Sequence, residues 1–434
     1  MKVFSLMVFV LFLSSCVLQK DVERLVNQKD VERIIRTLAA DDMQGRAVFS
    51  PGIEKAAKFI ETEFQAIGLQ PLDGLSDFRQ DFSMLNISPS LISATVNAEP
   101  VEEDNIVVVT DQPALNWTQA SGVAVHYIKE GESFTSRYGD IMKQGKPAVV
   151  FVANEFVSSF KQMHRYFMGD RVVKEQVKKP EMVFILGAPD VSEFNIQFAN
   201  KIEKSPLFNV AGVIPGKTNP DEYVIFSGHY DHIGIIEEAA GDSIANGADD
   251  DASGVTAVIT LARYFKKLNN NARTLIFVAF TGEESGMLGS QYFSTQLKPE
   301  QVTAMFNIEM IGKQSKFGPN TAFITGFERS DFGAILQRNL SGTGFAFHPD
   351  PYQAQNLFYR SDNASLAELG VPAHTISTVQ IDQDKYYHTV DDEVETLDIG
   401  NITATIKAIA LSSRSIVDAV ETPKRVALRE RKTP

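Results

Sequence analysis

The 434-residue chain has one cysteine and one tryptophan, and its 41 basic residues are outnumbered by 55 acidic ones. A lone cysteine, Cys16, cannot form an internal disulfide, so the fold has to be stabilised by packing. The formal net charge of −14 excludes the basic surface with which nucleic-acid-binding proteins displace counterions from phosphates. We therefore expect no nucleic-acid partner, and an acidic surface of this size is explained by solubility alone.

The apolar run from Val3 to Leu13 is too short to span a bilayer as a permanent helix. With Lys2 before it and Ser14-Ser15-Cys16 after it, it resembles a bacterial lipoprotein signal, in which the cysteine becomes the lipid-bearing first residue. The alternative is an ordinary secretory signal, with Cys16 incidental. Both predict export to the cell envelope (periplasm or outer membrane) rather than a cytoplasmic protein, with membrane contact only through an anchor at Cys16.

The length predicts a large domain with an insertion. Residues 21–84 are expected to form a helical N-terminal part, because Ser50-Pro51-Gly52 is typical of a helix start and Gly68 of a helix end. Between residues 85 and 204, short β-like runs alternate with polar turns and no clear helix is evident, which predicts a β-rich insertion domain. Residues 421–434 are expected to form a polar tail.

From residue 205 to residue 420, strands alternate with helices. The clearest helix is 254–268, and the strand at 274–280 is apolar after its threonine, as is typical of a central strand covered on both faces. A last helix is expected at 399–420, and further strands at 209–215, 223–227, 304–310, 322–325 and 372–377. The pattern predicts an α/β fold with a doubly wound, mainly parallel sheet and helices on both faces.

Acidic residues and histidines follow these strands. Ligands in such folds bind beyond the carboxyl ends of the strands. The candidates at this edge are His229 and Asp231 after the strand ending at Ser227, Asp250 before the helix at 254, Glu283 and Glu284 after Phe280, Glu309 at the end of the strand from 304, and His388 after the last strand. Their convergence predicts one site.

The residue types indicate a metal site. Two zinc ions about 3.5 to 4 Å apart need a bridging carboxylate, and each needs an imidazole and a further carboxylate. Glu283 beside a ligand is the expected general base, and Asp231 is expected to orient the imidazole of His229. The aspartate run 249–251 alone would also suit calcium, but the nearby histidine favours zinc. The set that meets the need is His229, Asp250, Glu284, Glu309 and His388.

Three further histidines are residual candidates. His232 is expected to point away from His229 in an extended segment. His374 lies within a predicted strand and is expected to be a core residue. His348 stays open.

The order His-x-Asp, Asp-Asp-Ala-Ser-Gly, Glu-Glu, Asp or Glu, and a late His resembles the zinc-dependent aminopeptidases with two co-catalytic metals. That family also contains glutamate carboxypeptidases, glutaminyl cyclases and the transferrin receptor. The resemblance covers residues 208–420, and 41–69 looks like the entry helices of secreted bacterial members. It implies two Zn²⁺ per chain, with Asp250 bridging them, His229 and Glu309 on one ion, Glu284 and His388 on the other, and Glu283 as the base.

The resemblance also implies a cis peptide bond between Asp250 and Asp251. It assigns Tyr387 as a donor to the oxyanion, with Tyr386 and Tyr359 as alternatives. Glu309 stands where an aspartate is often found, and the family accepts either residue.

The implied activity is that of an exopeptidase, for which we favour an aminopeptidase with a peptide substrate. A carboxypeptidase stays open, because Arg360 lies in a family-like loop and is suited to a substrate carboxylate. A glutaminyl cyclase needs one zinc and a receptor-like module has lost ligands, so the complete five-residue set argues against both. The sequence predicts no oligomeric state.

Overall fold

The computed structural model describes residues 21–169, 171–174, 180–187, 190–239 and 241–428. The predicted signal segment, residues 1–16, lies outside this range. The chain divides into two compact units, one formed by the residues up to Phe82 together with those from Leu207, and the other by Ser83–Pro206. The boundaries predicted from the sequence, 85 and 204, lie just inside the second unit. Within the described residues, no helix has the length and apolar character needed to cross a membrane.

The first unit is built on a mixed, mainly parallel sheet, as predicted. β10 pairs in parallel with β13 and β14, and β14 with β17, whereas β9 and β15 are antiparallel to their neighbours β13 and β17. Every residue of β13 is buried, as expected for a central strand. The strand order is β16 (Ala346–Pro349), β15 (Thr321–Ile324), β17 (Ala373–Ser377), β14 (Val302–Ile308), β10 (Asn219–His229), β13 (Arg273–Phe280) and β9 (Phe194–Ile214).

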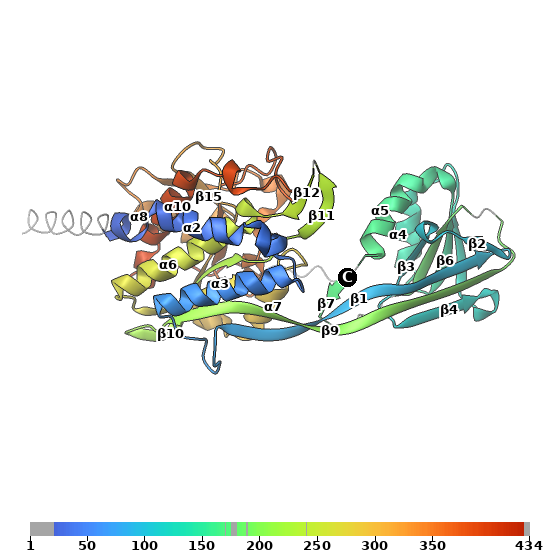
Figure 1. The fold of residues 1–434 in the computed structure, drawn as a ribbon, viewed down its shortest axis with the longest axis horizontal. Helices are drawn as coiled ribbons and strands as arrows, with labels where there is room; N and C mark the ends of the chain where they lie inside the picture. The colour runs from blue at the N-terminus through green and yellow to red at the C-terminus, as the bar shows by residue number, and fades with distance from the viewer. Residues whose placement is uncertain (1–20, 170, 175–179, 188–189, 240, 429–434) are drawn as a thin grey trace, which may run out of the picture. The chain divides into compact units, whose positions relative to one another are not determined.

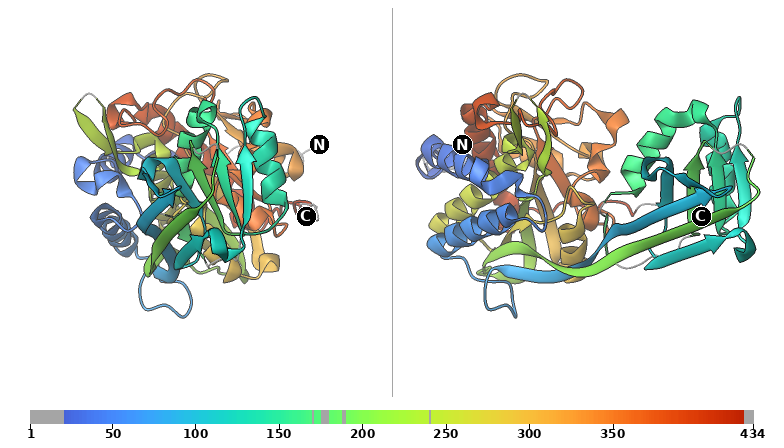
Figure 2. Two further views of the ribbon diagram at one scale, coloured as in Figure 1. Left: turned by 90° about the vertical axis from the view of Figure 1, so that its right-hand side faces the viewer. Right: turned by 45° about the vertical axis from the view of Figure 1, so that its right-hand side comes forward.

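Helices cover both faces of this sheet. Alternate side chains of β10 point in opposite directions, so that Phe226 joins one apolar cluster and Ile225 another. The first cluster includes residues of α2 (Gln28–Leu38), α3 (Pro51–Ile67), α6 (Gly254–Leu268) and α10 (Ile399–Ser412), and the second those of α7 (Leu288–Thr295) and α9 (Asn363–Ala367). Helices α3 and α6 lie side by side (Figure 1), and the right-hand view of Figure 2 shows the same neighbours, blue and yellow, from another direction.

Helix ends follow the sequence signals where a cap is present. Ser50 accepts a hydrogen bond from the backbone N–H of Ile53, and Gly68 ends α3 with a φ of 82°. The helix predicted at 399–420 is shorter: α10 ends at Ser412 and a separate turn, α11, covers Arg414–Val417.

The second unit contains two helices that the sequence analysis does not predict. Ser133 caps α4 (Phe134–Lys143), and α5 (Val157–Phe167) buries Phe160 and Met163. The predicted strands are confirmed as a four-stranded sheet in the order β3 (Ile106–Val109), β8 (Met182–Leu186), β6 (Ala148–Val152) and β5 (Ala124–Ile128). The interpretation as a β-rich domain missed these two helices, because both are short and bury only a few side chains.

Two further expectations need correction. The sequence predicts a strand at 209–215, but β9 begins at Phe194, and the long β1 (Arg79–Val96) is not predicted at all. Residues 421–428 of the predicted tail pack against the first unit, where Val426 is buried and its N–H donates to the carbonyl of Gly370. Residues 429–434 lie outside the described range.

Candidate metal centre

Three parallel strands end at the same level and bring the predicted site residues to one edge. His229 is in register with Phe280 on β13, and Ser227 is in register with Asn307 on β14. The Glu283–Glu284 pair follows β13 and Glu309 follows β14 directly, so the predicted convergence at the carboxyl ends is present.

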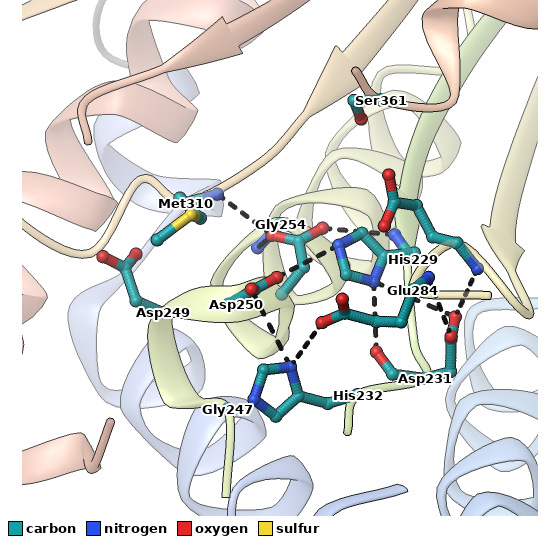
Figure 3. Close-up of polar contacts among 12 residues, drawn as sticks. His229, Asp231, His232, Gly247, Asp249, Asp250, Gly254, Glu284, Met310 and Ser361 are labelled. Carbon is teal, nitrogen blue, oxygen red and sulfur yellow. Dashed lines mark hydrogen bonds and ion pairs between the residues drawn. The ribbon is translucent and has the colours of Figure 1, made fainter. Parts of the chain in front are cut away.

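Asp250 lies between two histidines. Its Oδ1 is 3.2 Å from His229 Nε2, and its Oδ2 is 3.3 Å from His388 Nε2. His388 Nε2 is also 3.0 Å from Glu284 Oε2. Two ligand atoms on a tetrahedral zinc ion, each bound at about 2.0–2.1 Å, are about 3.3 Å apart. The spacing of these donor atoms therefore fits zinc, and Figure 3 shows Asp250 beside His229.

Several of the atoms that could bind a metal have no hydrogen-bond partner. His229 Nε2, His388 Nε2 and Glu309 Oε2 are buried, and none of them is hydrogen-bonded within the described residues. Buried polar atoms are normally paired, so unpaired nitrogen and oxygen atoms among these carboxylates and imidazoles indicate a missing positive partner. A divalent metal ion meets that requirement.

Asp251 holds the loop around Asp250. Its carboxylate accepts hydrogen bonds from the backbone N–H groups of His229 at 3.1 Å, Gly254 at 3.0 Å and Met310 at 3.1 Å. It thereby connects the ends of β10 and β14 to the start of α6. The Asp250–Asp251 peptide bond is cis, as the family resemblance implies.

Two charged residues missed by the sequence analysis also hold this loop. The Asp392 carboxylate accepts from the backbone N–H groups of Asp249 and Asp250, each at 3.1 Å. Arg46 is 1% exposed and donates to the backbone carbonyls of Asn246 at 2.6 Å and Gly247 at 2.9 Å. These contacts join residues about 140 to 200 positions apart in the sequence, so no local sequence pattern predicts them.

Asp231 acts differently from the prediction. Its carboxylate is 3.9 Å from His229 Nδ1, too far for a hydrogen bond, and the backbone carbonyl of Asp231 contacts that nitrogen at 3.1 Å instead. The carboxylate accepts from the backbone N–H groups of Glu283 at 3.1 Å and Glu284 at 3.3 Å. Asp231 thus orients His229 through its main chain and fixes the Glu-Glu turn through its side chain.

The expectation for His232 is wrong. Its Nδ1 lies 2.8 Å from Glu284 Oε1 and 3.8 Å from Asp250 Oδ2, so the ring belongs to the site (Figure 3). The predicted alternation fails because β10 ends at His229 and the following residues are not in a strand. His374 is buried in β17, as expected, and the ring of His348 stacks on that of Phe317 and is not among the residues that line the cavity.

The site holds an excess of buried negative charge. Burial lowers the pKa of His388, but Asp250 and Glu284 outweigh it and raise that pKa to about 10. Burial and the nearby carboxylates raise the pKa of Glu309 to about 7, although His229 opposes them. Burial likewise raises the pKa of Glu283 well above its ordinary value.

A cavity opens beside these residues. It is lined by Asp250, Glu283, Glu284 and Glu309 on one side, and by Tyr387 among others. The alternatives Tyr386 and Tyr359 are not among its lining residues. Burial raises the pKa of Tyr387 above its ordinary value, so its hydroxyl keeps its proton at neutral pH.

The model of Peptidase family M28 matches residues 209–412, a range that contains all five predicted ligands. This region of the chain matches peptidase family M28. The match confirms the resemblance drawn from the motifs and supports a zinc-dependent metallopeptidase.

The chain is also similar to curated relatives and, in its fold, to solved structures. A "Probable leucine aminopeptidase" of Trichophyton verrucosum is 27% identical over 313 residues, or 68% of this chain and 79% of that protein. A "Probable zinc metalloprotease" of Pyrenophora teres f. teres is 41% identical over 109 residues, which is 24% of this chain and only 23% of the relative's length. The aminopeptidase from Aneurinibacillus sp. strain AM-1 shares the fold, with a TM-score of 0.59 at 18% identity, covering 96% of this chain and 98% of that one.

Proposed function

We propose that this M28 peptidase is an aminopeptidase that uses two zinc ions to hydrolyse peptide bonds next to a free N-terminus. The observation that carries the proposal is Asp250, whose two carboxylate oxygens lie close to two different histidines, as a bridging ligand requires. One ion would be held by His229 and Glu309, the other by Glu284 and His388.

The surrounding side chains are suited to the remaining steps. Bound zinc would supply a Lewis acid for the substrate carbonyl and would acidify water. Glu283 takes the proton from the attacking water and passes it to the leaving amine, and its raised pKa makes it a stronger base for the first of these transfers. The protonated hydroxyl of Tyr387 donates to the oxyanion that develops on the carbonyl oxygen.

The assignment of Glu283 is tested by Glu283→Gln. We expect kcat on a leucyl peptide to fall by at least about 100-fold, because a general base contributes about that much, while two zinc ions stay bound. Metal content is measured by elemental analysis, and Glu328→Gln, at an exposed position, serves as the control. Activity within about tenfold of the parent protein would show that another group is the base.

A carboxypeptidase is the second candidate, because Arg360 lines the cavity and a guanidinium binds a carboxylate well. The two activities are separated with one peptide in three forms: unblocked, N-acetylated and C-amidated. An aminopeptidase cleaves the unblocked and amidated forms, whereas a carboxypeptidase cleaves the unblocked and acetylated forms. The leucine aminopeptidase name of the Trichophyton verrucosum relative supports the first outcome.

We also propose that the chain is exported and anchored in the cell envelope through a lipid at Cys16, and that its substrate is a peptide. The proposal rests on the sequence pattern around Cys16 alone. Cys16→Ala is expected to release the protein from membranes into the soluble fraction. Unchanged membrane association would contradict the lipid anchor.

A further inference from the structure

His232 is the one histidine of the centre without an assigned role. Its Nδ1 lies 2.8 Å from Glu284 Oε1, and its side chain is fully buried (Figure 3). Because an ionised carboxylate only accepts hydrogen bonds, the hydrogen lies on Nδ1. His232 therefore donates to Glu284.

The two oxygens of Glu284 consequently have different neighbours. Oε1 accepts from His232, whereas Oε2 lies 3.0 Å from His388 Nε2 and so faces the predicted position of a metal. A free carboxylate can bind a metal through one or both oxygens. Occupation of Oε1 by His232 leaves Oε2 as the ligand atom.

The ring of His232 is fixed in place by its surroundings. A Cβ on Gly247 would come within 2.6 Å of the ring carbons, and Gly247 has a φ of +56°, so this position favours glycine. The ring also lies edge-on to that of His388, with centroids 5.7 Å apart. The backbone N–H of His232 donates to the carbonyl of Arg46 at 3.3 Å.

We propose that His232 is a positioning residue for the second zinc ion, where its Nδ1–H holds Glu284 Oε1 so that only Oε2 binds the metal together with His388 and Asp250. The inference rests on the metal assignment in the proposed function. Direct binding by His232 is the competing arrangement, because ligand atoms of His232, Asp250 and Glu284 lie within 4.8 Å of one another. The 2.8 Å contact with Glu284 favours the positioning role, since a metal would displace the Nδ1 hydrogen.

The experiment compares His232→Leu, which cannot donate, with His232→Asn, whose amide can donate from nearly the position of Nδ1. Zinc affinity is measured by competition with a chromophoric chelator, and the histidine control is His348→Asn, because that ring stacks on Phe317 and does not line the cavity. Loss of a hydrogen-bonding partner to a ligand typically weakens metal binding about 10- to 100-fold. We expect a loss of this size for one of the two zinc ions in His232→Leu, and near-parent affinity in His232→Asn.

Two results would overturn the proposal. Unchanged binding of both ions by His232→Leu would remove any role for the ring, and failure of His232→Asn to restore affinity would indicate direct ligation. If His232→Leu does not fold, the parent protein loaded with ¹¹³Cd decides by NMR. Coupling from cadmium to His229 and His388 but not to His232 is expected, and coupling to His232 contradicts a positioning role.

These readouts do not depend on peptide hydrolysis. The protein could lack peptidase activity and still show the zinc affinities and cadmium couplings expected above. That result would contradict the proposed function and leave the role of His232 intact. Conversely, an active aminopeptidase in which His232→Leu binds zinc normally would contradict only the role of His232.

Discussion

Two histidines of the first unit, His374 in the sheet and His388 at the edge of the sheet, show opposite responses to their surroundings. His374 lies in β17 against the rings of Phe332 and Phe358, and burial lowers its pKa to about 4. Burial also acts to lower the pKa of His388, but Asp250 reverses the shift and the pKa rises to about 10.

The two rings differ in depth, since His374 is fully buried and the side chain of His388 is 36% exposed, but the neighbouring charge sets the direction of each pKa shift. His374 hydrogen-bonds to a backbone carbonyl, that of Thr325, and to the hydroxyl of Ser330, so it is satisfied as a neutral ring. His388 faces carboxylates that require a positive partner, which is either a proton or a metal ion. The same residue type is thus a structural element in one place and a predicted metal ligand in the other.

The largest expected effect comes from removing the negative charge of Asp250, which is present beside His388 and has no counterpart beside His374. Asp250→Asn takes away the carboxylate shared by His229 and His388, and we expect a loss of at least one zinc ion and a fall in activity on the order of 1,000-fold or more. Zinc content and peptide hydrolysis are the measurements. Asp391→Asn, at a nearby exposed position, is the control. A variant with two bound zinc ions would show that Asp250 does not bridge them.

The next largest effect is the contribution of His374 to the pH dependence of the free energy of unfolding. Unfolded His374 takes up a proton below its ordinary pKa of about 6.5, whereas the folded ring stays neutral until about pH 4. The unfolded state therefore binds more protons in this window, and stability falls as the pH drops from about 6.5 to about 4. The contribution is about 3 kcal/mol, from about 1.4 kcal/mol for each pKa unit.

The measurement is denaturant unfolding of the metal-free protein at a series of pH values. His374→Gln keeps a polar side chain but does not titrate, and it is expected to flatten the dependence between pH 4 and 6.5. Parallel curves for parent and variant would mean that His374 has the same pKa in the folded and the unfolded chain, so that its burial does not keep the ring neutral.

The five predicted ligands are found from the sequence because their places relative to strands and helices are visible, such as Glu284 after the apolar β13 and Asp250 before α6, and they stay predictions until a metal is bound. It fails for His232, because the path of the chain after β10 depends on the loop around Arg46. Asp392 and Arg46 escape prediction for a related reason: each acts on the backbone of a distant loop.

The long strands show the same limit in the fold. The start of β9 carries an alternation of Phe194, Ile196 and Phe198 that is typical of a strand, but the polar residues that follow hide its continuity with 209–214. The spacing of apolar residues therefore predicts which helices and strands are buried. Contacts between polar groups that are distant in the sequence can be identified only from the tertiary structure.

The smallest expected effect is a pH dependence of zinc binding. His388, with a pKa of about 10 in the metal-free protein, carries a proton at neutral pH and has to lose it to bind zinc. Zinc affinity at its site is therefore expected to rise about tenfold for each pH unit between pH 6 and 8, with about one proton released per ion. Calorimetry in buffers of different ionisation enthalpy measures that proton directly. Zinc binding without proton release would mean that His388 is neutral like His374, so that Asp250 and Glu284 do not outweigh burial at the edge of the sheet.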